Sequence, residues 1–122
     1  MKKLLFLSLT LFLAYFPSAY AVNYVSFETN LTRVSLPMGA TYGGDALMYI
    51  NNPESERTFP ANGIVCFGLW LPKDDPGTKN ALAIALSAIT AKKKVHVTVR
   101  DDKWAGSSTY FCQVHHIGLL DY

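Results

Sequence analysis

Histidines, paired carboxylates and loop aromatics are the side chains of this sequence that could act chemically on a ligand. His115 and His116 are adjacent, and with His96 they raise the question of a metal site. Adjacent residues of a regular strand point to opposite faces of a sheet, so this pair is not expected to reach one ion. No Cys, Asp or Glu stands at ligand spacing to complete a set. The sequence therefore predicts no metal and no cofactor.

Two pairs of acids, Asp74-Asp75 and Asp101-Asp102, lie in polar stretches rather than apolar surroundings. A glycosidase needs two carboxylates that face each other across a cleft. The chain also lacks the G-x-S-x-G segment of serine hydrolases. We therefore predict no catalytic residues and a protein that is not an enzyme. A small secreted enzyme that uses Asp101-Asp102 and His115-His116 is a rival hypothesis.

Aromatic residues in polar loops are the more promising group. Trp104 lies in the polar connection Asp101–Ser108, and Tyr42 lies in a glycine-rich loop. An exposed ring offers a flat apolar face on which sugars or bases stack. The alternative is a ring that folds back onto the protein, and for Trp104 the sequence leaves both placements open. Trp104, Tyr42 and Ser107 are the candidate glycan-binding residues.

Five apolar segments are predicted to be strands, and these strands must position the residues named above. Val95, Val97 and Val99 alternate with polar residues, as in a half-buried strand. The full set is Asn23–Leu36, Ala46–Ile50, Gly63–Leu71, Val95–Arg100 and Thr109–Leu120. A helix capped by Thr78 or Asn80 is expected to run to Ala91. Its apolar residues fall at spacings of three and four, so it is expected to be largely buried: Leu82, Ala85, Leu86 and Ile89.

The order β-β-β-α-β-β predicts a mostly-β fold with one helix, namely a five-stranded OB-fold barrel. Residues 22–122 would form this single domain. Residues 1–21 have the pattern of a secretory signal peptide: Lys2 and Lys3, the apolar run Leu4–Phe16, and Ala19-Tyr20-Ala21 as a cleavage site. The run is shorter than the about 20 residues that a membrane span needs. We expect cleavage before Val22 and a secreted or periplasmic bacterial protein.

Lys2 and Lys3 also account for the net charge of +2, so the mature chain is neutral. A neutral domain lacks the basic excess of nucleic-acid-binding proteins. The two cysteines, Cys66 and Cys112, fall in the exported part of the chain. Such a pair usually forms a disulfide, and the absence of a C-x-x-C segment makes a metal site the weaker alternative. The bridge would tie the third strand to the fifth.

Four stretches of the mature chain together carry a family pattern: Tyr24-Val25-x-x-x-Thr29-Asn30 with Ser35 and Met38 beyond, Val65-Cys66-Phe67-Gly68, Asn80–Val99, and Cys112 with Ile117 and Leu119. They resemble the B subunits of bacterial toxins that combine one A chain with five B chains, closest to the pertussis-toxin and subtilase-cytotoxin types. No Tyr-Tyr-Ser occurs here, so the sugar-contacting serine of the subtilase type is not carried over.

The resemblance implies a homopentameric ring, joined through edge strands, that binds glycans on host cells and delivers an enzymatic A subunit. The expected partners are thus further copies of the chain, an A subunit and cell-surface glycans, without nucleic acid or membrane insertion. A toxin B subunit of this kind would serve virulence. The alternative is a monomeric exported OB-fold protein with a structural or inhibitory role, which would form no ring and bind no sugar.

Overall fold

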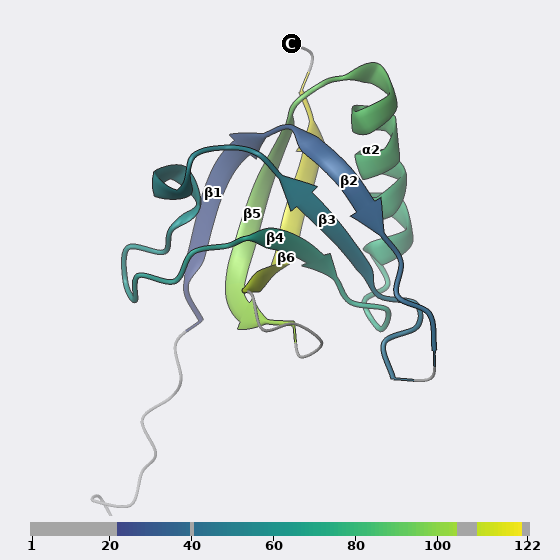
Figure 1. Ribbon diagram of the computed structural model, residues 1–122, viewed down its shortest axis with the longest axis horizontal. Coiled ribbons are helices and arrows are strands. Elements are labelled where there is room, and N and C mark those ends of the chain that lie inside the picture. Colours follow the sequence, from purple (N-terminus) through teal and green to yellow (C-terminus); the bar gives the residue numbers. More distant parts are fainter. Residues whose placement is uncertain (1–21, 40, 105–109, 121–122) are drawn as a thin grey trace, which may run out of the picture.

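The computed structural model describes residues 22–39, 41–104 and 110–120, and Figure 1 shows how their elements are arranged. The prediction of a mostly-β fold with one helix is confirmed for these residues, but the sheet has six strands, not five. The predicted signal peptide and Ser107 lie outside the described residues. The elements are β1 (Tyr24–Thr29), β2 (Leu31–Ser35), β3 (Ala46–Ile50), the 3-10 helix η1 (Glu54–Arg57), β4 (Gly68–Leu71), α2 (Thr78–Ala91), β5 (Val95–Lys103) and β6 (Phe111–Leu119).

The six strands form one sheet in the order β1-β5-β6-β4-β3-β2. Neighbours are antiparallel except β4 and β6, which are parallel. The sheet does not close into the expected barrel, because β1 and β2 stand at its two ends. Only Asn30 separates these end strands in the chain, so the sheet must curl strongly to bring its ends together, as Figure 1 shows.

The extra strand arises because the predicted strand Asn23–Leu36 is divided at Asn30. The part before Asn30 pairs with β5, and the part after it pairs with β3. The pairing of β2 also shifts register between Leu31 and Arg33, which marks an irregular strand. A bend of this kind involves a polar residue of ordinary type, so periodicity alone does not reveal it.

The core lies between the inner side of the sheet and α2. Val95, Val97 and Val99 are fully buried, as their alternation predicts. Helix α2 contributes only Ala85 and Ala88 as buried residues. The expectation of a largely buried helix is therefore wrong, because small alanines bring the helix close to the sheet while its opposite side faces solvent.

The ends of α2 also differ from expectation. The residue at the N-cap is Gly77, and no side chain caps the helix there. The Thr78 hydroxyl donates to the Pro72 carbonyl instead. At the other end Lys92 adopts a left-handed conformation with φ of 54°, and its backbone N–H bonds to the Ala88 and Ile89 carbonyls. No helix within the described ranges is long and apolar enough to cross a membrane.

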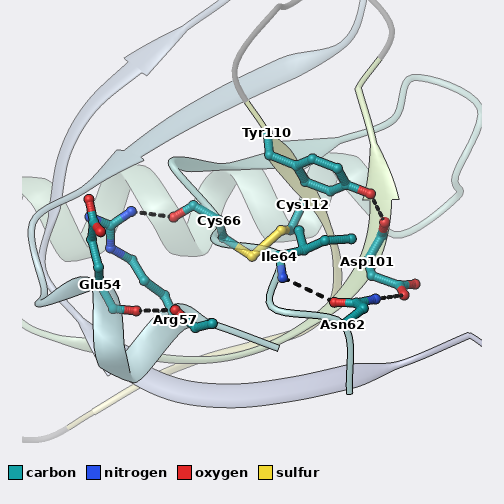
Figure 2. Close-up of a disulfide and its surroundings, with 9 residues drawn as sticks. Glu54, Arg57, Asn62, Ile64, Cys66, Asp101, Tyr110 and Cys112 are labelled. Atoms are coloured by element: carbon teal, nitrogen blue, oxygen red, sulfur yellow. Dashed lines mark hydrogen bonds between the residues drawn. A yellow bond between two sulfur atoms is a disulfide. The ribbon is translucent and has the colours of Figure 1, made fainter. Parts of the chain in front are cut away.

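A disulfide joins Cys66 and Cys112, whose Cα atoms are 5.5 Å apart and which are both fully buried (Figure 2). Cys66 precedes β4 instead of lying within it, because the predicted strand Gly63–Leu71 forms regular pairing only from Gly68. Arg57 holds this segment in place: its Nη1 donates to the Cys66 carbonyl, and the Cys66 N–H donates to the Arg57 carbonyl. The bridge thus anchors the approach to β4 onto β6.

Candidate functional site

The register of the strands places a continuous row of side chains on the outer side of the sheet, away from the core. Leu47, Trp70 and Gln113 are directly opposed on β3, β4 and β6. Gln113 in turn opposes Arg100 on β5, and Arg100 opposes Tyr24 on β1. Directly opposed residues project from the same face of a sheet. We call these five residues the transverse row.

Aromatic residues gather at the β3–β4 end of this row. Their rings meet at short range: the centroids of Tyr42 and Trp104 are 5.2 Å apart, those of Trp104 and Phe111 6.1 Å, and those of Tyr49 and Phe111 5.5 Å. These tilted and edge-on arrangements are the favoured ones for aromatic pairs. We call the group the aromatic cluster; it consists of Tyr42, Leu47, Tyr49, Trp70, Trp104 and Phe111.

Trp104 forms the base of the cluster and does not offer a free face to solvent. Its side chain is only 7% exposed, and its Nε1–H donates to Oδ2 of the buried Asp45 at 3.2 Å. Oδ1 of Asp45 accepts the Lys73 backbone N–H at 2.8 Å. Of the two placements that the sequence left open, the structure has the ring folded back onto the protein. Trp104 would therefore support a ligand site from below rather than stack on a ligand.

The accessible surface of the cluster comes from Tyr42, Tyr49 and Trp70, which are all half-buried. The guanidinium carbon of Arg33 lies 3.9 Å from the centre of the Tyr49 ring, within the range of a cation–π contact. Nε1 of Trp70 is buried and has no hydrogen-bond partner among the described residues. Rings and nitrogen donors thus occur side by side on this part of the sheet.

Gly68 makes this packing possible. A Cβ atom built at Gly68 would lie 2.3 Å from Cε1 of Phe111 and 2.8 Å from the Met48 carbonyl oxygen. Only a residue without a side chain lets the Phe111 ring lie against β4 at that point. In this position Phe111 fills the space between Tyr49 and Trp104.

The other end of the transverse row is polar. Nη2 of Arg100 forms an ion pair with Oδ2 of Asp102 at 3.1 Å, with both side chains about a third exposed. Nε of Arg100 is buried and has no partner within the part of the chain that the structure describes. The Tyr24 ring meets the His115 ring edge-on at 5.1 Å. This end of the row therefore carries Arg100, which is paired with Asp102 and whose Nε–H has no partner among the described residues.

The two adjacent histidines lie on the same side of the sheet. The pairing of β5 and β6 shifts by one residue between Thr98 and Val99, so β6 carries a bulge at His115. His115 reaches Tyr24, and the ring of His116 lies 6.2 Å from that of His96. The prediction that the two histidines point to opposite faces is wrong, because the bulge breaks the alternation. In the described ranges no three His, Cys, Asp or Glu side chains are grouped to hold a metal ion.

A cleft of about 240 Å³ lies where β4 and β6 separate beside the start of α2. Its lining includes apolar residues, Leu71, Ile84 and Ile117, as well as the polar Asn80 and His115. Of the paired acids, Asp75 belongs to this cleft and accepts the Gly77 N–H at 2.8 Å. Asp101 is buried elsewhere and Asp102 pairs with Arg100. The structure does not bring the two acid pairs together.

The sequence predicted Tyr42 and Trp104 but missed Arg33, Tyr49, Trp70 and Gln113. Trp70 was hidden in a run that is apolar at every position, Leu69-Trp70-Leu71. Its neighbours face the core and Trp70 faces outward, a difference that a continuous apolar run does not reveal. Comparisons of the chain with protein-family models, with curated proteins and with solved structures find no match.

Proposed function

We propose that this chain is an exported glycan-binding module whose aromatic cluster, with the transverse row beside it, forms the sugar-contacting face. The observation that carries the proposal is the gathering of the half-buried rings of Tyr49 and Trp70 beside the exposed Arg33, whose guanidinium lies over the Tyr49 ring. Aromatic rings bind the apolar C–H faces of sugars, and N–H groups bind sugar hydroxyls. Arg33 and Gln113 would supply such donors at the two sides of the rings.

The fold supports this placement, and we propose that it is of the OB type. If β1 and β2 are counted as one strand bent at Asn30, the fold has five strands, and the sheet order begins and ends with the two halves of that bent strand. The OB-fold is such a five-stranded, partly open barrel. The helix between β4 and β5 and the parallel pair β4–β6 accord with it.

In OB-folds the face of the second and third strands, with two flanking loops, binds oligosaccharides and oligonucleotides. With β1 and β2 counted as one strand, those strands are β3 and β4, and the loops are the connections from β2 to β3 and from β5 to β6. Tyr42 and Trp104 come from these loops, and Leu47, Tyr49 and Trp70 come from the two strands. The neutral charge of the mature chain favours a glycan over a nucleic acid as the ligand.

We extend the proposal to assembly. The end strands β1 and β2 each have one neighbour among the described strands. Unpaired strand edges attract further strands, so copies of the chain would join by these edges into a ring. An enzymatic A subunit is the partner that the resemblance to toxin B subunits implies for such a ring.

A glycan array probed with the oxidised protein from Val22 to Tyr122 tests the function. We expect Trp70→Ala and Arg33→Ala to weaken binding to the glycans found by about tenfold or more. Phe67→Ala is the matched control, because Phe67 is a 48% exposed ring with Arg57 above it at 5.8 Å but lies outside the cluster. An array without any bound glycan, or equal losses for Trp70→Ala and Phe67→Ala, would reject the proposal.

A further inference from the structure

Asp101 is a buried carboxylate whose hydrogen bonds tie together several segments of the chain. Its side chain is 5% exposed. Oδ2 accepts hydrogen bonds from the side-chain amides of Asn23 and Asn62, both at 2.9 Å, and Oδ1 accepts the Asn23 backbone N–H at 3.3 Å. Figure 2 shows the Asn62 bond beside the disulfide. All three donors are neutral.

Among the side chains that the structure describes, no cation is paired with Asp101. Ionised groups inside proteins are usually paired with an opposite charge, because hydrogen bonds to neutral donors repay only part of the cost of burial. The ion pair found in the described part of the chain joins Arg100 to Asp102 and leaves Asp101 out. Asp101 is therefore a buried carboxylate that has neutral donors and no cationic partner among the described side chains.

The expected cleavage before Val22 would supply such a cation. Signal peptidase adds one water across the Ala21–Val22 peptide bond; the C–N bond breaks, Ala21 leaves with a carboxylate, and Val22 keeps an amine that is protonated at neutral pH. This ammonium stands one residue before Asn23, whose N–H already contacts Asp101. Consecutive Cα atoms are about 3.8 Å apart, so the ammonium would lie within one residue of a backbone N–H that already contacts the carboxylate.

We propose that Asp101 is the binding site for the N-terminal ammonium of the processed chain, an inference that rests on the proposed cleavage before Val22. The uncleaved chain has an uncharged amide nitrogen at Val22 and cannot form this ion pair. Removal of the signal peptide then completes the fold as well as releasing the protein.

The contacts around Asp101 explain why this pair would matter. The Asp101 N–H donates to the Asn23 carbonyl at 3.2 Å, so residue 101 of β5 holds the residue that leads into β1. The Tyr110 hydroxyl donates to the Asp101 carbonyl (Figure 2). Asn62 connects the same carboxylate to Ile64, which stands two residues before Cys66. The ion pair would thus connect the new N-terminus, through Asp101, to the segment before the disulfide and to the segment before β6.

The test compares protein that starts at Val22 with protein that carries a Gly-Ser-Gly-Ser extension before Val22, each with Asp101 or Asp101→Asn. We expect the extension to lower Tm by about 4–8 °C with Asp101 and to have no effect with Asp101→Asn. Asp102→Asn is the matched control, in which the extension should still lower Tm, because Asp102 already pairs with Arg100. Equal Tm values for the two starts of the Asp101 protein would overturn the inference.

A second measurement needs no variant and decides the matter if Asp101→Asn does not fold. NMR titration of protein labelled at Val22 should show the pKa of its amine above the ordinary range of about 7.7–8.0, because the carboxylate favours the charged form. An amine pKa within that range would contradict the inference. N-terminal sequencing of the exported protein tests the cleavage position separately, and glycan binding is tested independently of both.

Discussion

The two tryptophans show how one residue type takes two roles in the same cluster. Trp104 is buried, and its indole N–H bonds to Asp45. Trp70 is half-buried, and its buried indole N–H has no partner among the described residues. The first therefore belongs to the support of the aromatic cluster, and the second has the partly exposed ring on which a ligand could stack. We therefore expect Trp104 to contribute mainly to stability and Trp70 to contribute mainly to ligand binding.

Replacement of each tryptophan by phenylalanine tests that separation. Trp104→Phe removes a donor from the buried Asp45 carboxylate, so we expect it to lower the free energy of unfolding by about 1–3 kcal/mol more than Trp70→Phe does. Trp70→Phe removes an N–H that has no partner to lose, and its main effect should fall on glycan affinity. Urea unfolding followed by fluorescence measures both variants. Equal losses of stability would show that the Asp45 bond contributes nothing.

Gly68 offers a residue-level test of the packing beneath the cluster. We expect Gly68→Ala to destabilise the protein by about 1–3 kcal/mol, because the new methyl group would overlap the Phe111 ring and the Met48 carbonyl. Gly118→Ala on β6 is the control, since a Cβ there meets only His116 Cε1, at an ordinary 3.6 Å. Thermal unfolding compares the two. A Gly68→Ala protein as stable as Gly118→Ala would mean that the Phe111 ring lies elsewhere.

At the scale of elements, the bends of the chain decide where the outer side chains meet. The division at Asn30 sends β1 and β2 to opposite ends of the sheet, and the bulge at His115 turns both histidines outward. The apolar pattern of the sequence predicts β3, β5 and most of β6, and the alternation of Val95, Val97 and Val99 also gives the buried side of β5. It fails at Asn30, at His115 and before Gly68, where the backbone departs from the regular strand and side-chain type carries no signal of the departure.

Helix α2 illustrates the same limit and provides a test. Its spacing predicted Leu86 on the buried side, but Leu86 is 49% exposed, and Ala85 and Ala88 make the contact with the core. We expect Leu86→Gln to change the free energy of unfolding by less than about 0.5 kcal/mol. Ala88→Leu should cost about 1–3 kcal/mol, because the space beneath the helix is filled. Chemical denaturation of both variants measures the difference, and the reverse ranking would place Leu86 in the core.

At the scale of the whole molecule, the proposed binding role rests on two features. Residues 22–122 carry as many acidic as basic side chains, and the aromatic cluster lies on the outer side of the sheet. A single weak sugar site gains avidity when several copies bind one cell surface, since linked sites act at a high effective concentration. A ring joined through β1 and β2 would present several aromatic clusters at once. Assembly and glycan binding are therefore linked proposals that can be measured separately.

The native mass of the oxidised protein from Val22 to Tyr122 tests assembly directly. We expect a five-membered ring of about 56 kDa rather than a monomer of about 11 kDa, scaled from the 13.5 kDa of the whole chain. Lysines on strand edges oppose pairing, so Ser26→Lys with Thr32→Lys, one on each end strand, should shift the mass to that of the monomer. Asp74→Lys in the exposed segment before α2 should leave the ring intact. A wild-type monomer at micromolar concentration would reject the ring and favour the monomeric exported protein. Glycan binding by that monomer would still be tested by the Trp70→Ala variant.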